Sequence, residues 1–255
     1  MTELIPGAAP VFINGNKTGF LFVHGFTASP HEGKDLVEWL HSELGITATV
    51  PLLKGHGTRP EDLLNVTWKD WYADVENKYS ELSKICDNIY VCGQSMGAAL
   101  ALKLAARQTV SGLITLAGAV FLKDWRLSLL PMARNFITFH YKSKGPDIKD
   151  RVMKPQIPTY RKYPVRSIDE LLSLFKSVRN DLAAVTAPAL LIHSRSDRTV
   201  HFSNLDYIMN HISSTVKEKL VLEESYHVIS IDVEKELIFN RIKEFINNIQ
   251  NNYHS

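Results

Sequence analysis

A serine between two glycines stands where the sequence changes from a predicted strand to a predicted helix. Gly93-Gln94-Ser95-Met96-Gly97 follows the apolar run 88–92 and precedes a run rich in Ala and Leu, 98–102. Such a corner forces the serine backbone into a strained conformation that only small residues two positions away on each side permit, and it lifts the hydroxyl above the sheet edge. The pattern predicts nucleophilic chemistry at Ser95. An ordinary glycine turn at the surface is the alternative.

Two further side chains are placed to activate a serine hydroxyl, which needs an imidazole to take its proton and a carboxylate to fix the imidazole tautomer. His227 follows the last predicted strand, 219–222, and Asp197 follows the predicted strand 188–193. Both lie with Ser95 at the carboxyl ends of strands, where open α/β sheets place catalytic groups. The chain order Ser, Asp, His is that of α/β hydrolases. The competing side chains lie before or within predicted elements, close to Asp197 or in the C-terminal tail: Asp181, Asp206, His193, His201 and His254.

Two backbone N–H groups are placed to stabilise the oxyanion that attack by Ser95 would create. The helix after Ser95 directs its N-terminus, with the N–H of Met96, toward that position. The segment 24–30 follows the first buried run and presents the N–H of Phe26, the second donor in enzymes with this corner. The same segment suits a strand-to-helix loop with Ser29 as N-cap and Pro30 as first helical residue, and both interpretations can hold together.

Strands and helices alternate along the chain at the spacing of a parallel sheet built by right-handed crossovers. The predicted strands are 18–25, 46–50, 88–92, 112–118, 188–193 and 219–222. The predicted helices are 31–44, 68–85 with Thr67 as cap, 96–107, and a C-terminal helix whose apolar face runs from Val233 to Ile249. The fold class is therefore α/β, with a mostly parallel central sheet and helices on both faces.

The regular alternation breaks between residues 119 and 182, which contain five prolines and no pattern of a buried strand. We interpret 119–182 as an inserted helical cap, or lid, and 1–118 together with 183–255 as the core domain. Within the cap the sequence predicts an apolar helix over 129–139. A capping box, Ser167-x-x-Glu170, predicts the start of a second helix.

The combination of motifs resembles the small bacterial carboxylesterases and monoacylglycerol lipases of the α/β-hydrolase superfamily. The motifs cover nearly the whole chain: HGFT at 24–27, KGHG at 54–57, GQSMG at 93–97, Asp197, and SYHV at 225–228. The resemblance implies an α/β-hydrolase fold in which Ser95, Asp197 and His227 form a catalytic triad. It implies that Phe26 and Met96 supply the oxyanion hole and that 119–182 is a mobile cap over an acyl pocket. It also implies an acyl-enzyme mechanism without metal or organic cofactor.

These features predict a serine carboxylic ester hydrolase acting on short- to medium-chain acyl esters, with monoacylglycerols as candidate substrates. The apolar cap side chains that would contact the acyl chain, or else only pack within the cap, are Leu129, Phe136 and Ile137. Monoacylglycerol lipases of the family hold the glycerol headgroup with a cap carboxylate, but no Asp or Glu occurs between Asp150 and Asp169 here. Gln156, Thr159 or Tyr160 would take that place. The alternatives left open are a broad carboxylesterase or thioesterase, a peptidase, a carbon–carbon bond hydrolase and a non-catalytic receptor on the same fold.

Charge and composition limit the partners. At 255 residues and 28.8 kDa, with 45% hydrophobic residues, the chain suits one large α/β domain with an insertion. A net charge of +2 gives no reason to expect nucleic acid binding. Residues 123–166 hold eleven Lys or Arg and three Asp, a local charge of +8. This charge is either a solvated loop face or a site of peripheral contact with anionic lipid.

Cysteine content and hydropathy predict the setting. Cys86 and Cys92 are too few for a disulfide framework, so we expect a reducing, cytoplasmic environment. The first sixteen residues carry no Lys or Arg and no apolar run is long enough to span a bilayer, so we expect no export.

His56 is either a structural residue of the loop 51–58 or a substrate contact. The sequence carries no indication of oligomeric state.

Overall fold

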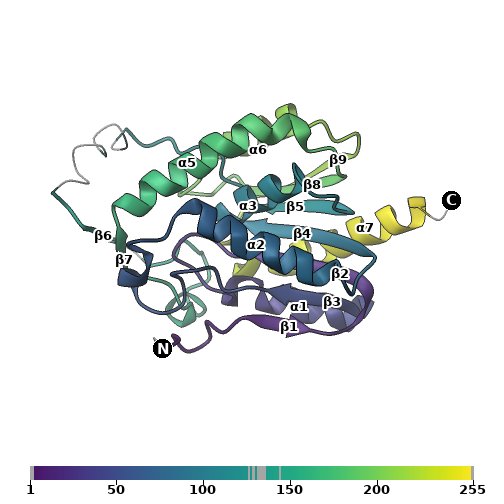
Figure 1. The fold of residues 1–255 in the computed structure, drawn as a ribbon, viewed down its shortest axis with the longest axis horizontal. Helices are drawn as coiled ribbons and strands as arrows, with labels where there is room; N and C mark the ends of the chain where they lie inside the picture. Colours follow the sequence, from purple (N-terminus) through teal and green to yellow (C-terminus); the bar gives the residue numbers. More distant parts are fainter. Residues whose placement is uncertain (1–2, 126, 128–129, 131–135, 144, 254–255) are drawn as a thin grey trace.

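Seven strands of the described part of the chain form the central sheet (Figure 1). The computed structural model describes residues 3–125, 127, 130, 136–143 and 145–253. The strands are β1 (Val11–Ile13), β2 (Asn16–Val23), β3 (Ile46–Val50), β4 (Asn88–Gln94), β5 (Gly112–Leu116), β8 (Ala189–Ser194) and β9 (Lys217–Leu222). Their order in the sheet is β1-β3-β2-β4-β5-β8-β9. β1 pairs antiparallel with β3, and the other neighbouring strands of this sheet are parallel.

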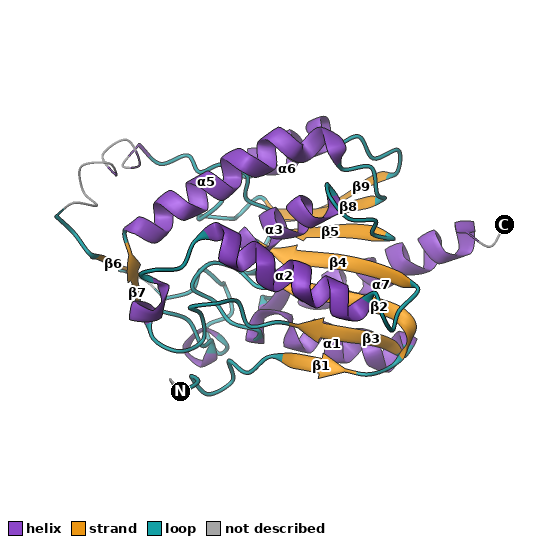
Figure 2. Ribbon diagram, in the orientation of Figure 1, coloured by secondary structure: helices purple, strands orange, loops and turns teal. Residues whose placement is uncertain are grey.

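Helices cover both faces of the sheet, so that the strands lie between two helical layers (Figure 2). The described helices are α1 (His31–Leu44), α2 (Trp68–Leu82), α3 (Met96–Ala105), α5 (Arg166–Asp181), α6 (Ser203–His211) and α7 (Lys235–Tyr253). Phe20 and Phe22 of β2 pack with α1 and α7, whereas Leu21 and Val23 pack on the other face with α2, α3 and α5. All four side chains are fully buried, which explains why residues 20–23 of β2 form a continuous apolar run.

The α/β class with a mostly parallel sheet and helices on both faces is confirmed. α1 has the predicted bounds, but α2 ends at Leu82 rather than at residue 85. β1 was not predicted, because three residues at a sheet edge carry no usable periodicity. The predicted apolar face of the last helix is wrong at its start, since Val233 precedes α7 and both Val233 and Leu237 are 49% exposed.

The chain between β5 and β8 contains a strand pair that the sequence did not predict. β6 (Phe139–Tyr141) and β7 (Lys162–Pro164) pair antiparallel in a separate two-stranded sheet. The predicted helix over 129–139 is therefore wrong at its end, because Phe139 begins β6 and residues 136–138 are not helical. Residues 129 and 131–135 of that prediction lie outside the described residues. Strands of three residues, one of them ending in proline, are too short to show an alternating pattern.

The start of α5 also corrects a prediction. The helix begins at Arg166, and the side chain of Ser167 is buried without a hydrogen-bond partner among the described residues. Glu170 does not complete a capping box with Ser167, because its Oε2 atom accepts the N–H of Trp68 at 3.1 Å. Glu170 thus satisfies an N–H group at the first turn of α2 and ties α5 to that helix.

The pair β6–β7 lies on the side of the molecule to which the arrowheads of the parallel strands point (Figure 2). α5 packs its buried face, with Leu171, Leu174, Phe175 and Val178, into the same apolar cluster as α2 and α3. The chain between β5 and β8 therefore joins the helical layer at one end and reaches over the carboxyl edge of the sheet at the other. Within the part of the chain described here, no helix is long and apolar enough to cross a bilayer.

Candidate active site

The strained corner predicted at Ser95 is present. β4 ends at Gln94, α3 begins at Met96, and Ser95 between them has φ 58° and ψ −115°, a conformation that L-residues rarely adopt. A Cβ atom at Gly93 would lie 2.2 Å from the carbonyl oxygen of Gly97. A Cβ atom at Gly97 would lie 2.0 Å from the carbonyl oxygen of Val23. The backbone of this corner therefore leaves room for glycine alone at both positions.

The three predicted side chains meet at the carboxyl edge of the sheet. Ser95 Oγ lies 2.9 Å from His227 Nε2, and His227 Nδ1 lies 2.8 Å from Asp197 Oδ2. Asp197 follows β8 and His227 follows β9, so each of the three comes from the loop after a different parallel strand. An acceptor-only carboxylate at Nδ1 requires that this nitrogen carries the proton, which leaves Nε2 free to accept the Ser95 hydroxyl proton.

His193 is a further partner of this group. Its place in a predicted strand argued against it as the imidazole that activates Ser95. Its Nε2 atom is 3.2 Å from Asp197 Oδ2 and 3.0 Å from the carbonyl oxygen of Val200. Both neighbours are acceptors, so Nε2 of His193 carries a proton. Asp197 Oδ1 accepts the N–H groups of Thr199 and Val200, at 2.8 Å each. The carboxylate is thus held from several directions while it orients His227. No motif in the sequence marks His193 for this role.

The electrostatics of the pair His227 and Asp197 favour an ionised carboxylate beside the imidazole. Burial alone would raise the pKa of Asp197, but the charge of His227 and hydrogen bonds from His193 and His227 hold it well below its usual range. Burial alone would lower the pKa of His227, but the charge of Asp197 and its hydrogen bond raise it above 6.5. Charges on Glu32 and Asp147 act on the pKa of His227 in the same upward direction.

The pH dependence of activity follows from this shift. A protonated His227 cannot accept the hydroxyl proton, so kcat/KM for a neutral ester is expected to fall as the pH falls, with a midpoint above 6.5. A pH profile of p-nitrophenyl butyrate hydrolysis measures that midpoint. A midpoint below 6.5 would contradict the pairing of His227 with Asp197 as the controlling interaction.

The loop 25–27 is held from both sides. The N–H of Gly25 donates to Glu32 Oε2 at 2.8 Å. Thr27 has a φ of 62°, and its carbonyl oxygen accepts the N–H of Tyr160 and the hydroxyl of Thr159, both at 3.0 Å. Among the described residues, the N–H groups of Phe26 and Met96 have no acceptor, and both residues line the cavity at Ser95. These two donors are therefore free to bind an oxyanion there.

Glu32 is a functional candidate that the sequence missed. It lies in the first turn of α1, where an acidic residue usually only complements the helix dipole. Here its side chain is buried, at 5% exposure, and lines the same cavity as Ser95. Burial raises the pKa of Glu32 to about 7, although the hydrogen bond from Gly25 and the charges of His227 and Lys142 act to lower it.

Replacement of Glu32 by glutamine is expected to change the pH dependence of stability. The folded-state pKa lies above 4.5, so ionisation of Glu32 costs stability as the pH rises toward 7. The free energy of unfolding of Glu32→Gln, minus that of the unmodified protein, should therefore rise by about 2 to 3 kcal/mol when the pH rises from about 5 to about 8. Urea denaturation at the two pH values measures this difference. Glu38→Gln, an exposed change on the same helix, is the control, and equal pH dependence of all three proteins would refute the assignment.

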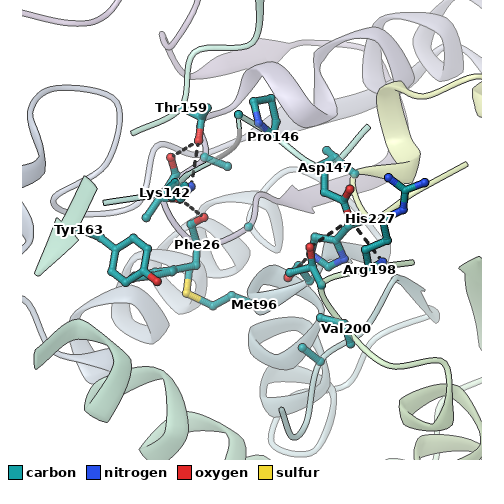
Figure 3. Close-up of a pocket in the computed structure, with 18 of the residues that line it drawn as sticks. Phe26, Met96, Lys142, Pro146, Asp147, Thr159, Tyr163, Arg198, Val200 and His227 are labelled. Atoms are coloured by element: carbon teal, nitrogen blue, oxygen red, sulfur yellow. Dashed lines mark hydrogen bonds between the residues drawn. The ribbon is translucent and has the colours of Figure 1, made fainter. Parts of the chain in front are cut away.

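A cavity of about 680 Å³ opens at Ser95 (Figure 3). Its wall combines apolar side chains with charged ones from distant parts of the chain. The apolar side chains include Phe26, Met96, Leu122, Ile168, Leu171, Phe175 and Val200. The charged side chains are Glu32, Lys142, Asp147, Lys154 and Arg198. A wall of this kind fits an apolar chain with a polar group at one end.

Of the described cap residues predicted to contact substrate, only Thr159 lines the cavity at Ser95. Phe136 and Ile137 do not line the cavity, and they are 84% and 50% exposed because this part of the chain is neither helical nor packed against the core. Gln156 is exposed and donates to the carbonyl oxygen of Val152. Tyr160 is buried, and its hydroxyl donates to the carbonyl oxygen of Gly55 at 2.9 Å. Leu129 lies outside the described residues.

The surroundings of His56 favour the first of its two interpretations, a structural residue of the loop 51–58. Its ring stacks on Tyr160 with an interplanar angle of 9° and contacts the rings of Phe26 and Trp71 edge to face. It is 1% exposed and does not line the cavity at Ser95. The aromatic group around His56 therefore supports the loop that carries Phe26.

Comparison with known proteins identifies relatives along nearly the whole chain. Residues 16–234 match the family described as serine aminopeptidase, S33. A thermostable monoacylglycerol lipase of Bacillus sp. (strain H-257) is 34% identical over 252 residues, which cover 96% of this chain and 98% of that protein. A carboxylesterase of Bacillus subtilis (strain 168) is 28% identical over 241 residues, 93% of this chain and 95% of that protein. The solved structure of a metagenome-derived lipolytic enzyme matches with a TM-score of 0.91 and 35% identity, over 96% of this chain and all of that chain.

Proposed function

Because this chain belongs to the serine aminopeptidase S33 family of α/β hydrolases, we propose that Ser95, His227 and Asp197 are the catalytic triad of its ester hydrolase activity. The protein is a serine carboxylic ester hydrolase, like the monoacylglycerol lipase and the carboxylesterase that it matches over nearly their full length. The observation that carries the assignment of the site is the continuous hydrogen-bonded chain from Ser95 Oγ to the buried carboxylate of Asp197 at the wall of the cavity.

The reaction proceeds through an acyl-enzyme. His227 Nε2 takes the proton of Ser95 as Oγ attacks the ester carbonyl, and Asp197 stabilises the imidazolium that forms. The N–H groups of Phe26 and Met96 hold the oxyanion. Collapse of the tetrahedral intermediate expels the alcohol, which receives the proton from His227. Water then attacks the acyl group with the same assistance and releases the acid together with free Ser95.

The substrates proposed are short- to medium-chain acyl esters, including monoacylglycerols. The apolar part of the cavity wall supports an acyl chain, and the relative of 34% identity is named a monoacylglycerol lipase. Hydrolysis rates of p-nitrophenyl esters and of monoacylglycerols with graded chain length test this proposal. We expect the highest kcat/KM below the long-chain range, and a protein that hydrolyses amides or thioesters but no oxygen ester would disprove it.

The segment 119–182 is proposed to act as the cap of this site. It supplies cavity residues from both of its ends and from its middle, among them Leu122, Lys142, Thr159 and Phe175. Its residues 159 and 160 bind the backbone of Thr27, next to the proposed oxyanion donor Phe26. Cap position and oxyanion geometry are therefore linked through three hydrogen bonds to one residue, since Lys142 Nζ also donates to Thr27 Oγ1 at 2.5 Å.

Peripheral contact of the cap with anionic lipid is a second proposal, favoured by one further observation. Several large apolar side chains are exposed in the same basic segment: Trp125, Phe136, Ile137, Tyr141 and Val152, each at least 50% exposed. Apolar insertion together with basic charge is the usual basis of reversible binding to a membrane surface.

Sedimentation with vesicles tests the lipid contact. We expect more binding to vesicles containing phosphatidylserine than to neutral ones, a loss of that excess in high salt, and about tenfold weaker binding for Phe136→Ser. Leu64→Ser, an exposed apolar change outside the cap, is the matched control. Equal binding of the unmodified protein to neutral and anionic vesicles, unaffected by salt, would exclude docking through the basic cap.

A reducing, cytoplasmic setting remains a proposal from the cysteine content. Cys86 and Cys92 are both buried free thiols. Burial raises the pKa of each, so neither is a reactive thiolate. Fractionation of the producing cells, with immunodetection of the protein, tests this setting directly.

A further inference from the structure

A second hollow, of about 400 Å³, opens beside the cavity that contains Ser95. The two share seven lining residues: Lys142, Ser143, Gly145, Pro146, Lys154, Ile157 and Thr159. They therefore form one continuous space with two compartments. The residues that line only the second compartment are Arg151, Pro155, Tyr160 and Arg161. We call this second compartment the basic hollow.

The charge of the basic hollow has a single sign. Lys142, Arg151, Lys154 and Arg161 line it, and no Asp or Glu does. Other cations of the same insertion are paired, since Lys149 Nζ lies 2.7 Å from Glu224 Oε2 and Lys162 Nζ lies 2.6 Å from Glu61 Oε1.

The cations of the basic hollow differ from those pairs. For the side chains of Arg151, Lys154 and Arg161, the described part of the chain provides neither an ion pair nor a hydrogen bond. Three unpartnered cations around one hollow repel one another, and an anion bound between them would remove that cost.

Lys142 stands where the two compartments meet. Its Nζ atom donates to Thr27 Oγ1 at 2.5 Å and reaches Thr159 Oγ1 at 3.5 Å. Burial lowers the pKa of Lys142 to about 8, and the charge of Glu32 opposes that change, so the side chain is a cation at neutral pH. Figure 3 shows Lys142 and Thr159 on the opposite side of the cavity from His227 and Arg198. An ester bound at Ser95 would therefore have the charged side chain of Lys142, and the basic hollow beyond it, on one side.

The apolar wall belongs to the other compartment. Leu122, Leu171 and Phe175 line the cavity at Ser95 and do not line the basic hollow. An acyl chain and an anionic group can therefore occupy separate walls at the same time, with the ester bond between them at Ser95.

We propose that the basic hollow binds a phosphate-like anionic group on the alcohol part of the substrate, through Arg151, Lys154 and Arg161 beside the junction residue Lys142. Guanidinium groups suit this ligand because they donate two parallel hydrogen bonds to its oxygens. The inference rests on the proposed esterase function and narrows its substrates to acyl esters of anionic alcohols.

The test compares two water-soluble esters with the same acyl group, 1-butyrylglycerol and 1-butyrylglycerol 3-phosphate, both used as monomers so that lipid docking plays no part. We expect kcat/KM to be at least about tenfold higher for the phosphate ester, and this preference to fall as salt increases. In Arg151→Gln/Arg161→Gln the preference is expected to disappear through a higher KM for the phosphate ester. Arg166→Gln removes a charge from an exposed position that lines neither compartment, and it is expected to keep the preference.

Binding of glycerol 3-phosphate, followed by calorimetry, separates this inference from the esterase proposal. We expect binding to the full-length protein, competition by inorganic phosphate at higher concentration, and loss of binding in Arg151→Gln/Arg161→Gln but not in Arg166→Gln. Equal kcat/KM for the two esters, or phosphate binding that survives the double change, would overturn the anion site. Binding that depends on Arg151 and Arg161 in a protein that hydrolyses neither ester would uphold the anion site and overturn the esterase.

Discussion

Ser95→Ala is expected to lower kcat for p-nitrophenyl butyrate by roughly 10⁵- to 10⁶-fold, because it removes the nucleophile and leaves only binding and the oxyanion donors. The fold should survive. The Ser95 side chain makes its one hydrogen bond within the described residues to His227 Nε2, and the corner conformation is set by the backbone around Gly93 and Gly97. Initial rates and thermal denaturation, measured on the same preparation, give both results.

The matched control is Ser29→Ala. Ser29 Oγ is buried and has no hydrogen-bond partner among the described residues, and Ser29 does not line the cavity. We expect this variant to keep turnover within about twofold of the unmodified protein. If Ser95→Ala kept comparable turnover while Ser29→Ala did not, the nucleophile would be misassigned.

Asp197→Asn is expected to lower kcat by roughly 10⁴-fold, the second-largest effect. An amide at this position can present its NH₂ group to Nδ1 of His227, which favours the tautomer with the proton on Nε2, where it cannot accept the Ser95 proton. The buried imidazolium of the transition state also loses its counter-charge. His193 would remain, but it is itself a donor to residue 197 and cannot replace the carboxylate.

The control for this change is Asp206→Asn, an exposed acid in the first turn of α6 that the sequence offered as a competing candidate. It is expected to leave turnover unchanged. Rates for all variants are compared above the acid midpoint, so that the protonation of His227 does not contribute. A loss smaller than about tenfold for Asp197→Asn would mean that another acid orients the imidazole.

The corner at Ser95 could be predicted from sequence because its geometry restricts the residue types. Only glycine fits at 93 and 97, so the two glycines of the motif indicate that other backbone atoms lie close to both positions. The order of strands then placed residues 197 and 227 at the same edge, where His227 lies within hydrogen-bond distance of both Ser95 Oγ and Asp197 Oδ2. Continuous apolar runs between helical segments likewise predicted the central strands, since strands covered on both faces have a continuous hydrophobic sequence.

Other parts of the site left no comparable sequence signal. Glu32 looks like an ordinary acid at a helix start, and only the fold shows that it is buried beneath Gly25. His193 lies in a strand whose neighbours are apolar, and its contact with Asp197 depends on how the chain turns after β8. Glu170 matched a capping box by its spacing from Ser167, but its carboxylate accepts the N–H of Trp68 at the start of α2. In each case a contact with a distant segment decided the role of the side chain.

The insertion was the least predictable part, because its strands are short and its helix packs on the core. Its residues that do reach the cavity include Lys142 and Thr159, which bind the loop next to Phe26. On the proposals above, substrate selection lies in the insertion, at the basic hollow beside them, and the bond-breaking groups lie at the edge of the sheet. Variation in the insertion could therefore change the preferred alcohol without disturbing Ser95, His227 and Asp197.

Labelling with a fluorophosphonate tests the central assignment most directly, because the reagent forms a stable bond to an activated serine. Peptide mass spectrometry of the labelled protein is expected to find one adduct, on Ser95, and the labelling rate is expected to fall with pH at the same midpoint as ester turnover. The adduct is expected to be absent in Ser95→Ala and to form much more slowly in Asp197→Asn. An adduct on a different serine, or no adduct in a protein that still hydrolyses esters, would contradict the account.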